Sequence, residues 1–485
     1  MTESKTMSRE LKVVSVGVLL MFIALMISGT YISVFQAEKL KADGRNVRTL
    51  YDSFSVERGA ILVEGTPIAS SVPVNDDFKF QRLYTQPELY APVTGYFSLN
   101  QGNSGVEGAL NQELSGSADN QTLTRLNAIF TGQKPKGSAV ELTLSASVQQ
   151  AAWDALGDRT GAVVAINPKT GAILAMVSKP TFDPNVFADH NTTAVIDAYN
   201  AMLADPAQPL FNRTITGNLY HPGSVFKLIV AAAALDSGAA TPETDFDNPA
   251  SLVLPGTNTT IRNANRGPCG GGERVTLADA LRLSCNIPFA EIGQSLGEGT
   301  VADYAHRFGY DQKLSIPTNV TSSTFPTGLD EAQLMMSSFG QWDVRTTPLQ
   351  VAMTTAAIAN GGVMMKPTLV DRMIAPDLTV EKPFTPTELG SPITPETAST
   401  MVGLMVNNVS SGAASSARIS GVDVGGKSGT AEGGVGASKT MWFTGFAPAN
   451  DPQVAVAVVV ENESGYGNLV AGPIAKKVIE AVLNK

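Results

Sequence analysis

An apolar run at residues 228–235 directly follows the segment Tyr-His-Pro-Gly-Ser-Val-Phe-Lys at 220–227. The run predicts a buried helix from 225 to 235 that ends near Gly238. Pro222 and Gly223 mark a turn before it, and Ser224 is a residue type that is favoured at the start of a helix. Ser224 would then lie at the positive end of the helix dipole, and the rest of the chain must be organised around this element.

Lys227 follows Ser224 by one helical turn on the same face, so its amine can reach the serine hydroxyl. An ammonium in mostly apolar surroundings loses its proton more easily than in water. A neutral amine beside a hydroxyl is a base that can make serine a nucleophile. The Ser-x-x-Lys pattern is nevertheless common by chance, and alone it is explained as well by a helix cap followed by a solvated lysine.

The chain has 485 residues, of which 43% are hydrophobic, so it is long enough for two or three domains with a large core. The net charge of -10 is spread along the sequence, which argues against nucleic acid as a partner. The histidines and cysteines do not fall at metal-ligand spacing, so we expect no metal and no cofactor. These residues are His190, His221, His306, Cys269 and Cys285.

Residues 13–37 contain no charged residue and are rich in Val, Leu, Ile, Met and Phe. The segment is longer than the roughly 20 residues that cross a bilayer and longer than a signal-peptide core, so it predicts an uncleaved transmembrane anchor. Residues 1–12 would form a cytoplasmic tail. Basic residues occur on both sides of the anchor, so the positive-inside rule does not decide its orientation.

Residues 38–142 are predicted to form a small, mostly β spacer or pedestal domain. We expect a polar helical stem at 38–50 and a β-hairpin of strands 58–62 and 68–72 around a turn at 64–67. Short strands and turns are expected through 91–96 and 105–108, followed by a small helix near 110–114. No pair of carboxylates in this segment indicates catalysis.

Residues 143–485 are predicted to form the main domain. We expect a helix at 146–156, an antiparallel hairpin of strands 161–166 and 172–177, two strands at 441–446 and 453–460, and a final helix at 474–483. Strands at both ends with helices between them favour one α+β domain whose terminal strands share a sheet.

Two further motifs carry chemistry. Ser-x-Asn at 284–286 follows a helical stretch at 277–281 and offers a hydroxyl that can pass a proton and an amide that can hold a substrate amide. At 424–431, Lys427 stands among hydroxyls and glycines at the start of a strand, which suits close approach by a ligand backbone and its carboxylate. Either motif alone is most simply a polar surface turn.

The order Ser-x-x-Lys, Ser-x-Asn and Lys-Ser-Gly is typical of penicillin-binding proteins and serine β-lactamases. The chain resembles the class B (monofunctional) penicillin-binding proteins, most closely their actinobacterial members. The resemblance runs through most of the chain after the anchor. Its landmarks, besides the three motifs, are residues 58–61, 161–178, 183–185, 340–341, 347–352, 359–362 and 442–448.

This resemblance implies an α+β transpeptidase domain of the penicillin-binding/β-lactamase type, with an antiparallel sheet, flanking helices and an all-helical part. By the resemblance, Ser224 attacks the penultimate D-alanine carbonyl of a peptidoglycan stem peptide and Lys227 takes its proton. Ser284 then relays a proton to the departing D-alanine, while Asn286 holds the substrate amide and contacts Lys227.

The third motif would bind the terminal carboxylate through Lys427, Ser428 and Thr430, with Gly429 between them. The backbone N–H groups of Ser224 and Thr430 would form the oxyanion hole. Two departures are visible: Ser428 stands where threonine is commoner, and His221 stands where the family usually has glutamate. The first keeps the hydroxyl, and we interpret the second as peripheral.

The implied protein is a plasma-membrane, single-pass D,D-transpeptidase whose catalytic domain is extracytoplasmic. Its partners would be stem peptides, penicillin and other β-lactams that react covalently at Ser224, and a SEDS-type membrane glycosyltransferase docked on the spacer. Alternatives on the same fold are a D,D-carboxypeptidase or β-lactamase, which use water as acceptor, and a non-catalytic β-lactam sensor. The sequence offers almost no cytoplasmic mass for a sensor, and an inert scaffold is opposed by the complete catalytic set.

Fast hydrolysis of a penicilloyl ester requires a second base, which class A β-lactamases supply as glutamate in a Glu-x-x-Leu-Asn segment. After Asn286, only Glu331 has leucine three positions on, and the asparagine is missing. We interpret Glu331 as a carboxylate at a helix start, so the sequence predicts slow deacylation.

Cys269 and Cys285 are the only cysteines, and Cys285 lies inside the Ser-x-Asn motif. In an extracytoplasmic domain they are candidates for a disulfide that would brace this turn. Two buried free thiols remain the alternative, because sequence alone does not give their geometry.

Overall fold

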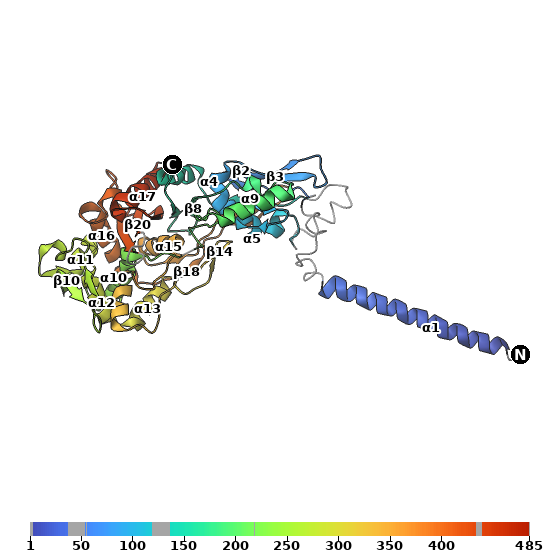
Figure 1. Ribbon diagram of the computed structural model, residues 1–485, viewed down its shortest axis with the longest axis horizontal. Coiled ribbons are helices and arrows are strands. Elements are labelled where there is room, and N and C mark those ends of the chain that lie inside the picture. Colours follow the sequence, from blue (N-terminus) through green and yellow to red (C-terminus); the bar gives the residue numbers. More distant parts are fainter. Residues whose placement is uncertain are drawn as a thin grey trace. The chain divides into compact units, whose positions relative to one another are not determined.

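The computed structural model describes residues 3–36, 54, 56–118, 136–217, 219–432 and 439–484. The chain divides into two compact units, residues 1–56 with 73–80, and residues 57–72 with 81–485. In the first, α1 (Glu3–Thr30) continues as a short π-helix, η1 (Tyr31–Phe35) (Figure 1). Arg9–Phe35 is long and apolar enough to cross a membrane, and none of it is buried in the protein. The end of the predicted anchor at Ala37 and the predicted stem at 38–50 lie outside the described residues.

The second unit contains a five-stranded antiparallel sheet in the order β19-β20-β21-β7-β8. The predicted hairpin of strands 161–166 and 172–177, the two predicted strands at 441–446 and 453–460, and the prediction that the terminal strands of the domain share a sheet are confirmed. The central strands are apolar over most of their length, as expected where both faces of a sheet are covered. The strands are β7 (Gly161–Ile166), β8 (Ile173–Lys179), β19 (Gly425–Glu432), β20 (Lys439–Ala447) and β21 (Val454–Glu461).

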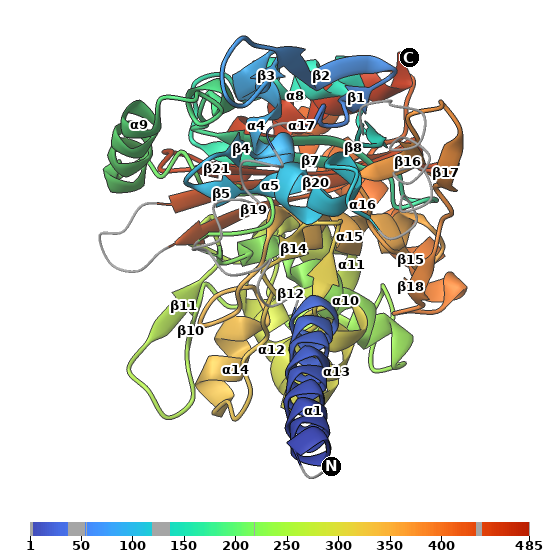
Figure 2. The same ribbon diagram turned by 90° about the vertical axis from the view of Figure 1, so that its right-hand side faces the viewer.

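Helices cover both faces of this sheet (Figure 2). One face packs on α8 (Ala146–Leu156) and α17 (Gly467–Leu483), and the other on α15 (Pro348–Ala359). Successive side chains of β21 point to opposite faces of the sheet. Val458 therefore packs in the hydrophobic core on the α17 side, and Val459 packs in the core on the α15 side.

The helix α8 has the predicted bounds, whereas α17 begins at Gly467 rather than 474. Pro473 lies inside α17, where proline removes one backbone hydrogen bond. The buried residues Ala471 and Gly472 lie in the first turns of α17, and their packing against the sheet region offsets that loss.

A second sheet has six strands in the order β17-β16-β6-β1-β2-β3. The predicted hairpin is confirmed as β1 with β2, and β1 also pairs in parallel with β6. Strands β16 and β17 come from much later in the chain and complete the sheet. The strands are β1 (Ile61–Val63), β2 (Thr66–Pro73), β3 (Phe80–Tyr84), β6 (Ala139–Leu142), β16 (Val370–Ile374) and β17 (Val380–Pro383).

The prediction of strands and turns through 91–96 and 105–108 is wrong, because α4 (Pro87–Thr94) and α5 (Gly105–Ala109) occupy most of these residues. Pro87 starts α4, where a missing N–H is harmless, and five of its residues are buried, so burial outweighs the proline inside the helix. Between these two helices the chain forms two short strands, β4 (Phe97–Ser98) and β5 (Gly102–Asn103). The small helix predicted near 110–114 is present as α6 (Asn111–Leu114).

The predicted buried helix at 225–235 is α10 (Lys227–Asp236), preceded by a 3₁₀ turn, η4 (Gly223–Val225). Every residue of α10 from Lys227 to Ala234 is buried. The helices around it are α11 (Leu277–Leu283), α12 (Ile287–Leu296), α13 (Glu298–Arg307) and α16 (Pro395–Ser411). The remaining elements are α9 (Thr192–Ala204), α14 (Glu331–Ser337), β9 (Asp245–Asp247), β10 (Ser251–Val253), β11 (Thr260–Arg262), β12 (Arg274–Thr276), β13 (Leu314–Ser315), β14 (Asn319–Val320), β15 (Met364–Met365) and β18 (Glu388–Gly390).

Candidate active site

Ser224 lies in the turn η4, between the edge strand β19 and the backbone at Gly340. The Gly223 N–H donates to the Gly340 carbonyl at 2.9 Å, and Gly223 has φ +54°. A Cβ at Gly223 would come within 2.8 Å of the Thr430 carbonyl oxygen. Glycine is therefore required here, and the close approach places half-buried Ser224 beside β19.

Lys227 is the first residue of α10 and is fully buried. Its Nζ donates to the Ser284 carbonyl at 2.8 Å and to Asn286 Oδ1 at 2.7 Å. Burial lowers the pKa of the Lys227 ammonium well below its usual value, and the nearby charge of Lys427 lowers this pKa further. The contact between Lys227 and Asn286 that the resemblance implied is present.

The Ser-x-Asn motif forms the turn between α11 and α12. Ser284 ends α11 in the left-handed conformation, with φ +62°, and this reversal directs the Ser284 hydroxyl and the Asn286 amide to two different lysines. The Asn286 Nδ2 donates to the Arg262 carbonyl at 2.9 Å. The turn therefore links Lys227, on α10, to Lys427, on the strand.

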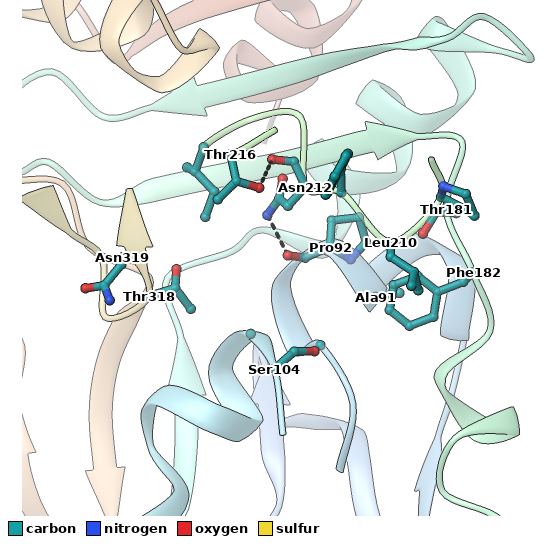
Figure 3. A pocket seen from close by; sticks show the side chains of 15 residues that line it. Ala91, Pro92, Ser104, Thr181, Phe182, Leu210, Asn212, Thr216, Thr318 and Asn319 are labelled. Carbon is teal, nitrogen blue, oxygen red and sulfur yellow. Dashed lines mark hydrogen bonds between the residues drawn. The ribbon is translucent and has the colours of Figure 1, made fainter. Parts of the chain in front are cut away.

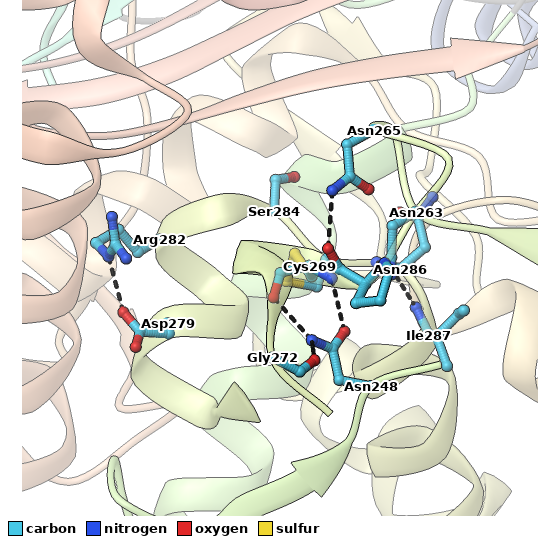
Figure 4. The surroundings of a disulfide bond; sticks show 12 residues. Asn248, Asn263, Asn265, Cys269, Gly272, Asp279, Arg282, Ser284, Asn286 and Ile287 are labelled. Atoms are coloured by element: carbon cyan, nitrogen blue, oxygen red, sulfur yellow. Dashed lines mark hydrogen bonds and ion pairs between the residues drawn. A yellow bond between two sulfur atoms is a disulfide. The ribbon is translucent and has the colours of Figure 1, made fainter. Parts of the chain in front are cut away.

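Sequence reasoning missed two buried asparagines, of which Asn263 holds this turn and Asn248 holds the loop at Cys269 (Figure 4). Asn263 Oδ1 accepts from the backbone N–H of Asn286 at 2.8 Å and of Ile287 at 3.1 Å. Asn248 Oδ1 accepts from the Cys269 N–H at 2.8 Å, and its Nδ2 donates back to the Cys269 carbonyl at 2.7 Å. These partners lie more than twenty residues apart, so no local sequence pattern could have identified them.

Cys269 and Cys285 are joined by a disulfide bond, with their Cα atoms 5.8 Å apart. Both cysteines are buried. Since Cys285 is the middle residue of the Ser-x-Asn turn, the bond ties that turn to the loop that Asn248 holds.

Lys427 lies on the edge strand β19 and is fully buried. Its Nζ donates to Ser284 Oγ at 2.7 Å and to the Ser428 carbonyl at 2.8 Å. Burial lowers the pKa of Lys427 to about 7. In the part of the chain that the structure describes, neither Lys427 nor Lys227 forms an ion pair with a carboxylate, so no counter-charge holds either lysine in its protonated form.

The side chains of Ser428 and Thr430 alternate with Lys427 along β19. The Ser428 hydroxyl donates to the Ala413 carbonyl at 2.6 Å, and Thr430 Oγ1 accepts from the Gly467 N–H at 3.2 Å. Between them, a Cβ at Gly429 would meet the side chains of Val225 and Trp442 at 3.2 and 3.1 Å. The Ser428 hydroxyl would have to rotate away from Ala413 to donate to a ligand carboxylate.

His221 lies outside the lysine cluster. Its Nε2 is 2.6 Å from Arg345 Nη1, and its backbone carbonyl accepts from the Trp442 indole at 3.0 Å. Burial and the charge of Arg345 lower the pKa of His221, which favours the neutral imidazole. The contacts of this residue are structural, in keeping with its interpretation as peripheral.

Glu331 is the first residue of α14, as predicted, after the N-cap residue Asp330. Its exposed carboxylate accepts a hydrogen bond from the Gln294 side chain. Glu331 therefore lies at a helix start, and its hydrogen bond is to Gln294 rather than to a motif residue around Ser224. Among the described residues no group of His, Cys, Asp or Glu is arranged to hold a metal ion.

An α+β fold that gathers Ser-x-x-Lys, Ser-x-Asn and Lys-Ser-Gly around one serine turn defines the class of serine penicillin-binding enzymes. The chain belongs to the penicillin-binding protein transpeptidase family, whose domain matches residues 161–480. Residues 58–140 match the penicillin-binding protein A dimerisation domain.

Known relatives match this chain along nearly its whole length. It is 41% identical to the peptidoglycan D,D-transpeptidase PbpA of Mycolicibacterium smegmatis over 99% of this chain and 100% of the relative. It is 40% identical to PbpA of Mycobacterium tuberculosis, over 98% and 99% of the two chains.

Among solved structures, the ceftriaxone acyl-enzyme complex of M. tuberculosis penicillin-binding protein A superposes with a TM-score of 0.86 at 39% identity, covering 89% of this chain and all of the other. Pseudomonas aeruginosa PBP2 superposes with a TM-score of 0.73 at 30% identity, covering 89% of this chain and 96% of the other. The predicted α+β transpeptidase fold is confirmed.

Proposed function

We propose that this protein is a peptidoglycan D,D-transpeptidase that crosslinks stem peptides through an acyl-enzyme and releases D-alanine. The observation that carries the proposal is the position of Lys227: it is fully buried next to the serine turn, without a carboxylate partner among the described residues, and its pKa is lowered. A neutral amine at that position can act as a general base at physiological pH. The names of the full-length mycobacterial relatives support the same activity.

In the first half-reaction, the Ser224 hydroxyl loses its proton to Lys227 as its oxygen attacks the carbonyl carbon of the penultimate D-alanine. The negative charge on the tetrahedral intermediate is stabilised by the backbone N–H groups of Ser224 and Thr430. When the peptide bond breaks, the leaving D-alanine nitrogen takes a proton from Ser284. Lys427, whose Nζ donates to Ser284 Oγ at 2.7 Å, gives Ser284 a proton in its place.

In the second half-reaction, the amine of a neighbouring stem peptide attacks the ester carbonyl and gives up a proton through the same groups. The Ser224–acyl bond breaks, the crosslinking amide forms, and the serine hydroxyl is restored. Lys427 with Ser428 and Thr430 would bind the terminal carboxylate of the donor peptide before acylation. Asn286, held by Lys227 and Arg262, would position the donor's amide.

The same serine would open a β-lactam ring, since penicillin-binding protein A of M. tuberculosis forms acyl-enzyme complexes with ceftriaxone and penicillin G. The apolar helix Arg9–Phe35 would anchor the protein as a single span in the plasma membrane, with the catalytic domain extracytoplasmic. We also infer that residues 58–140 form a docking module for a SEDS-type membrane glycosyltransferase.

Intact mass spectrometry tests the proposal on the purified protein. After incubation with penicillin, the mass should rise by that of one drug molecule, and the label should map to Ser224. After incubation with a stem-peptide thioester and an amine acceptor, the crosslinked amide should form in preference to the free acid. Formation of the free acid alone would favour a carboxypeptidase.

A further inference from the structure

A pocket of about 250 Å³ lies in the second unit and shares no residue with the Ser224 site. Its walls come from three parts of the chain, within residues 91–105, 181–216 and 318–319 (Figure 3). The first part belongs to the segment that matches the dimerisation domain, and the other two belong to the transpeptidase match. The pocket is therefore built by both family segments together.

Two threonine hydroxyls in its wall have no hydrogen-bond partner among the residues that the structure describes. Thr181 Oγ1 and Thr318 Oγ1 are both buried atoms, and they lie toward opposite ends of the pocket in Figure 3. Leaving a buried hydroxyl unpaired costs about 1–3 kcal/mol. Because both oxygens are almost fully buried, each threonine side chain would have to turn its hydroxyl toward the pocket, and a ligand with hydroxyl or amide groups at both ends would then pair with both.

The lining has no charged side chain, so an ionised ligand would lose its hydration without gaining a counter-charge. This disfavours a carboxylate, an ammonium group or a phosphate. The apolar part of the wall includes Phe182 and Leu210, which Figure 3 shows side by side at one end. A fitting ligand is thus neutral, with hydroxyls on its edge and a face of C–H groups.

The volume limits the size of the ligand. Pockets for drug-sized molecules measure about 300–1,000 Å³, so a pocket of this size takes about one ring with its substituents.

We propose that this pocket is a second, non-catalytic binding site for one neutral sugar ring. The hydroxyl or acetamido groups of the sugar pair with Thr181 and Thr318, and its C–H face packs on the wall at Phe182. The sugar comes either from a glycan chain or from a free saccharide. In the glycan case the inference rests on the proposed function, because the substrate polymer then supplies the ring.

The test uses the full chain in a detergent without a sugar head group, after reaction with penicillin so that Ser224 is blocked. The probes are N-acetylglucosamine and its β-1,4-linked tetramer, observed by saturation-transfer NMR. We expect saturable binding. The variant Thr181→Val/Thr318→Val keeps the side-chain shapes and should weaken binding at least about tenfold, because two hydrogen bonds are lost. Thr193→Val, exposed on α9 outside the pocket, is the matched control and should bind as the wild type does.

Tighter binding of the tetramer than of the monosaccharide identifies a glycan as the source, and equal binding identifies a free sugar. The inference is overturned if no saturable signal appears at about 50 mM probe, or if the double variant binds as tightly as the wild type. Penicillin uptake by each variant reports its folding. If the double variant takes up no drug, a wild-type crystal soaked with the monosaccharide decides, and density only outside the pocket overturns the proposal. Failure of the wild type to take up penicillin would contradict the proposed function instead.

Discussion

At the scale of single residues, the site depends on two lysines that are buried without a counter-charge among the described residues. Lys227 contacts Asn286 and the Ser284 carbonyl, and Lys427 contacts the Ser284 hydroxyl. Burial lowers the pKa of both lysines. For Lys227 this favours the neutral amine, which a general base requires. In the proposed mechanism, the desolvated amine of Lys227 is thus the base, which is the role that a histidine has in other serine enzymes.

The nucleophile is tested by Ser224→Ala. This variant should take up no penicillin, while its free energy of unfolding changes by less than about 1 kcal/mol, because a half-buried hydroxyl is all that is removed. Lys227→Ala should slow acylation by about 10²–10⁴-fold through loss of the base. Intact mass and the rate of drug uptake measure both effects, and drug bound to another serine in Ser224→Ala would refute the assignment.

The pH dependence of acylation tests the lowered pKa values. Protonation inactivates Lys227 as a base, so the acylation rate should fall as the pH drops through its lowered pKa and stay level above it. Since Lys427 depresses that pKa, Lys427→Met should move the acidic limb of the residual rate to higher pH. Stopped-flow uptake of a chromogenic β-lactam between about pH 5 and 9 measures the limb. A shift of this acidic limb to lower pH would contradict the inference that Lys427 lowers the pKa of Lys227.

Lys427 should also affect stability in a defined direction. Its folded pKa of about 7 lies below its usual value, so the unfolded state binds more protons between the two. The free energy of unfolding should therefore rise with pH across that window, by at most about 1.4 kcal/mol per pH unit relative to Lys427→Met. Denaturant titrations of the two proteins at neutral and alkaline pH give the comparison, and parallel curves would show that Lys427 titrates normally.

At the scale of elements, the site is a meeting of η4, the turn between α11 and α12, and the edge strand β19. Sequence reasoning predicted all three motif segments and the buried helix behind Ser224, because each has a local pattern of hydroxyls, lysines and apolar periodicity. It missed Asn248, Asn263 and the close approach of Gly223 to Thr430, since these contacts join residues that are distant in the sequence. It also predicted strands and turns where α4 forms, a helix that contains Pro92 and is held by its buried residues.

The packing of η4 on β19 is tested by Gly223→Ala. The added Cβ would lie 2.8 Å from the Thr430 carbonyl oxygen, at a residue with φ +54°, so the turn must move away from the strand. We expect acylation to slow at least about tenfold and the protein to lose about 1–3 kcal/mol of stability. Gly238→Ala has a similar φ of +72° and no atom within 4 Å, so it isolates the backbone strain. Equal acylation by the two variants would contradict the packing argument.

The bond between Cys269 and Cys285 is tested by titrating thiols in the denatured, unreduced protein, which should show none. Cys269→Ala should lower the free energy of unfolding by about 3 kcal/mol in the chain-entropy model and slow acylation, because the Ser-x-Asn turn loses its brace. Wild type treated with a reductant is the control and should behave alike. Two free thiols in the untreated wild type would rule the bond out.

At the scale of the whole molecule, the arrangement favours transfer to an amine over hydrolysis. Glu331, the one candidate for a deacylating base in the sequence, is the first residue of α14, and its carboxylate accepts a hydrogen bond from Gln294. The protein should therefore show a burst of one drug molecule per enzyme, followed by turnover over hours. Steady penicillin hydrolysis near one per second, followed in the spectrophotometer, would reveal a base that lies elsewhere.

The six-stranded sheet has a consequence for how such proteins diversify. Its strands β1, β2, β3 and β6 come before the catalytic domain in the chain, whereas β16 and β17 come from within it. An N-terminal segment transplanted from a distant relative would have to match the backbone of β16 along β6, not merely join the chain at one peptide bond. Recombination at a single crossover should thus yield poorly folded hybrids, and the two segments should be inherited together.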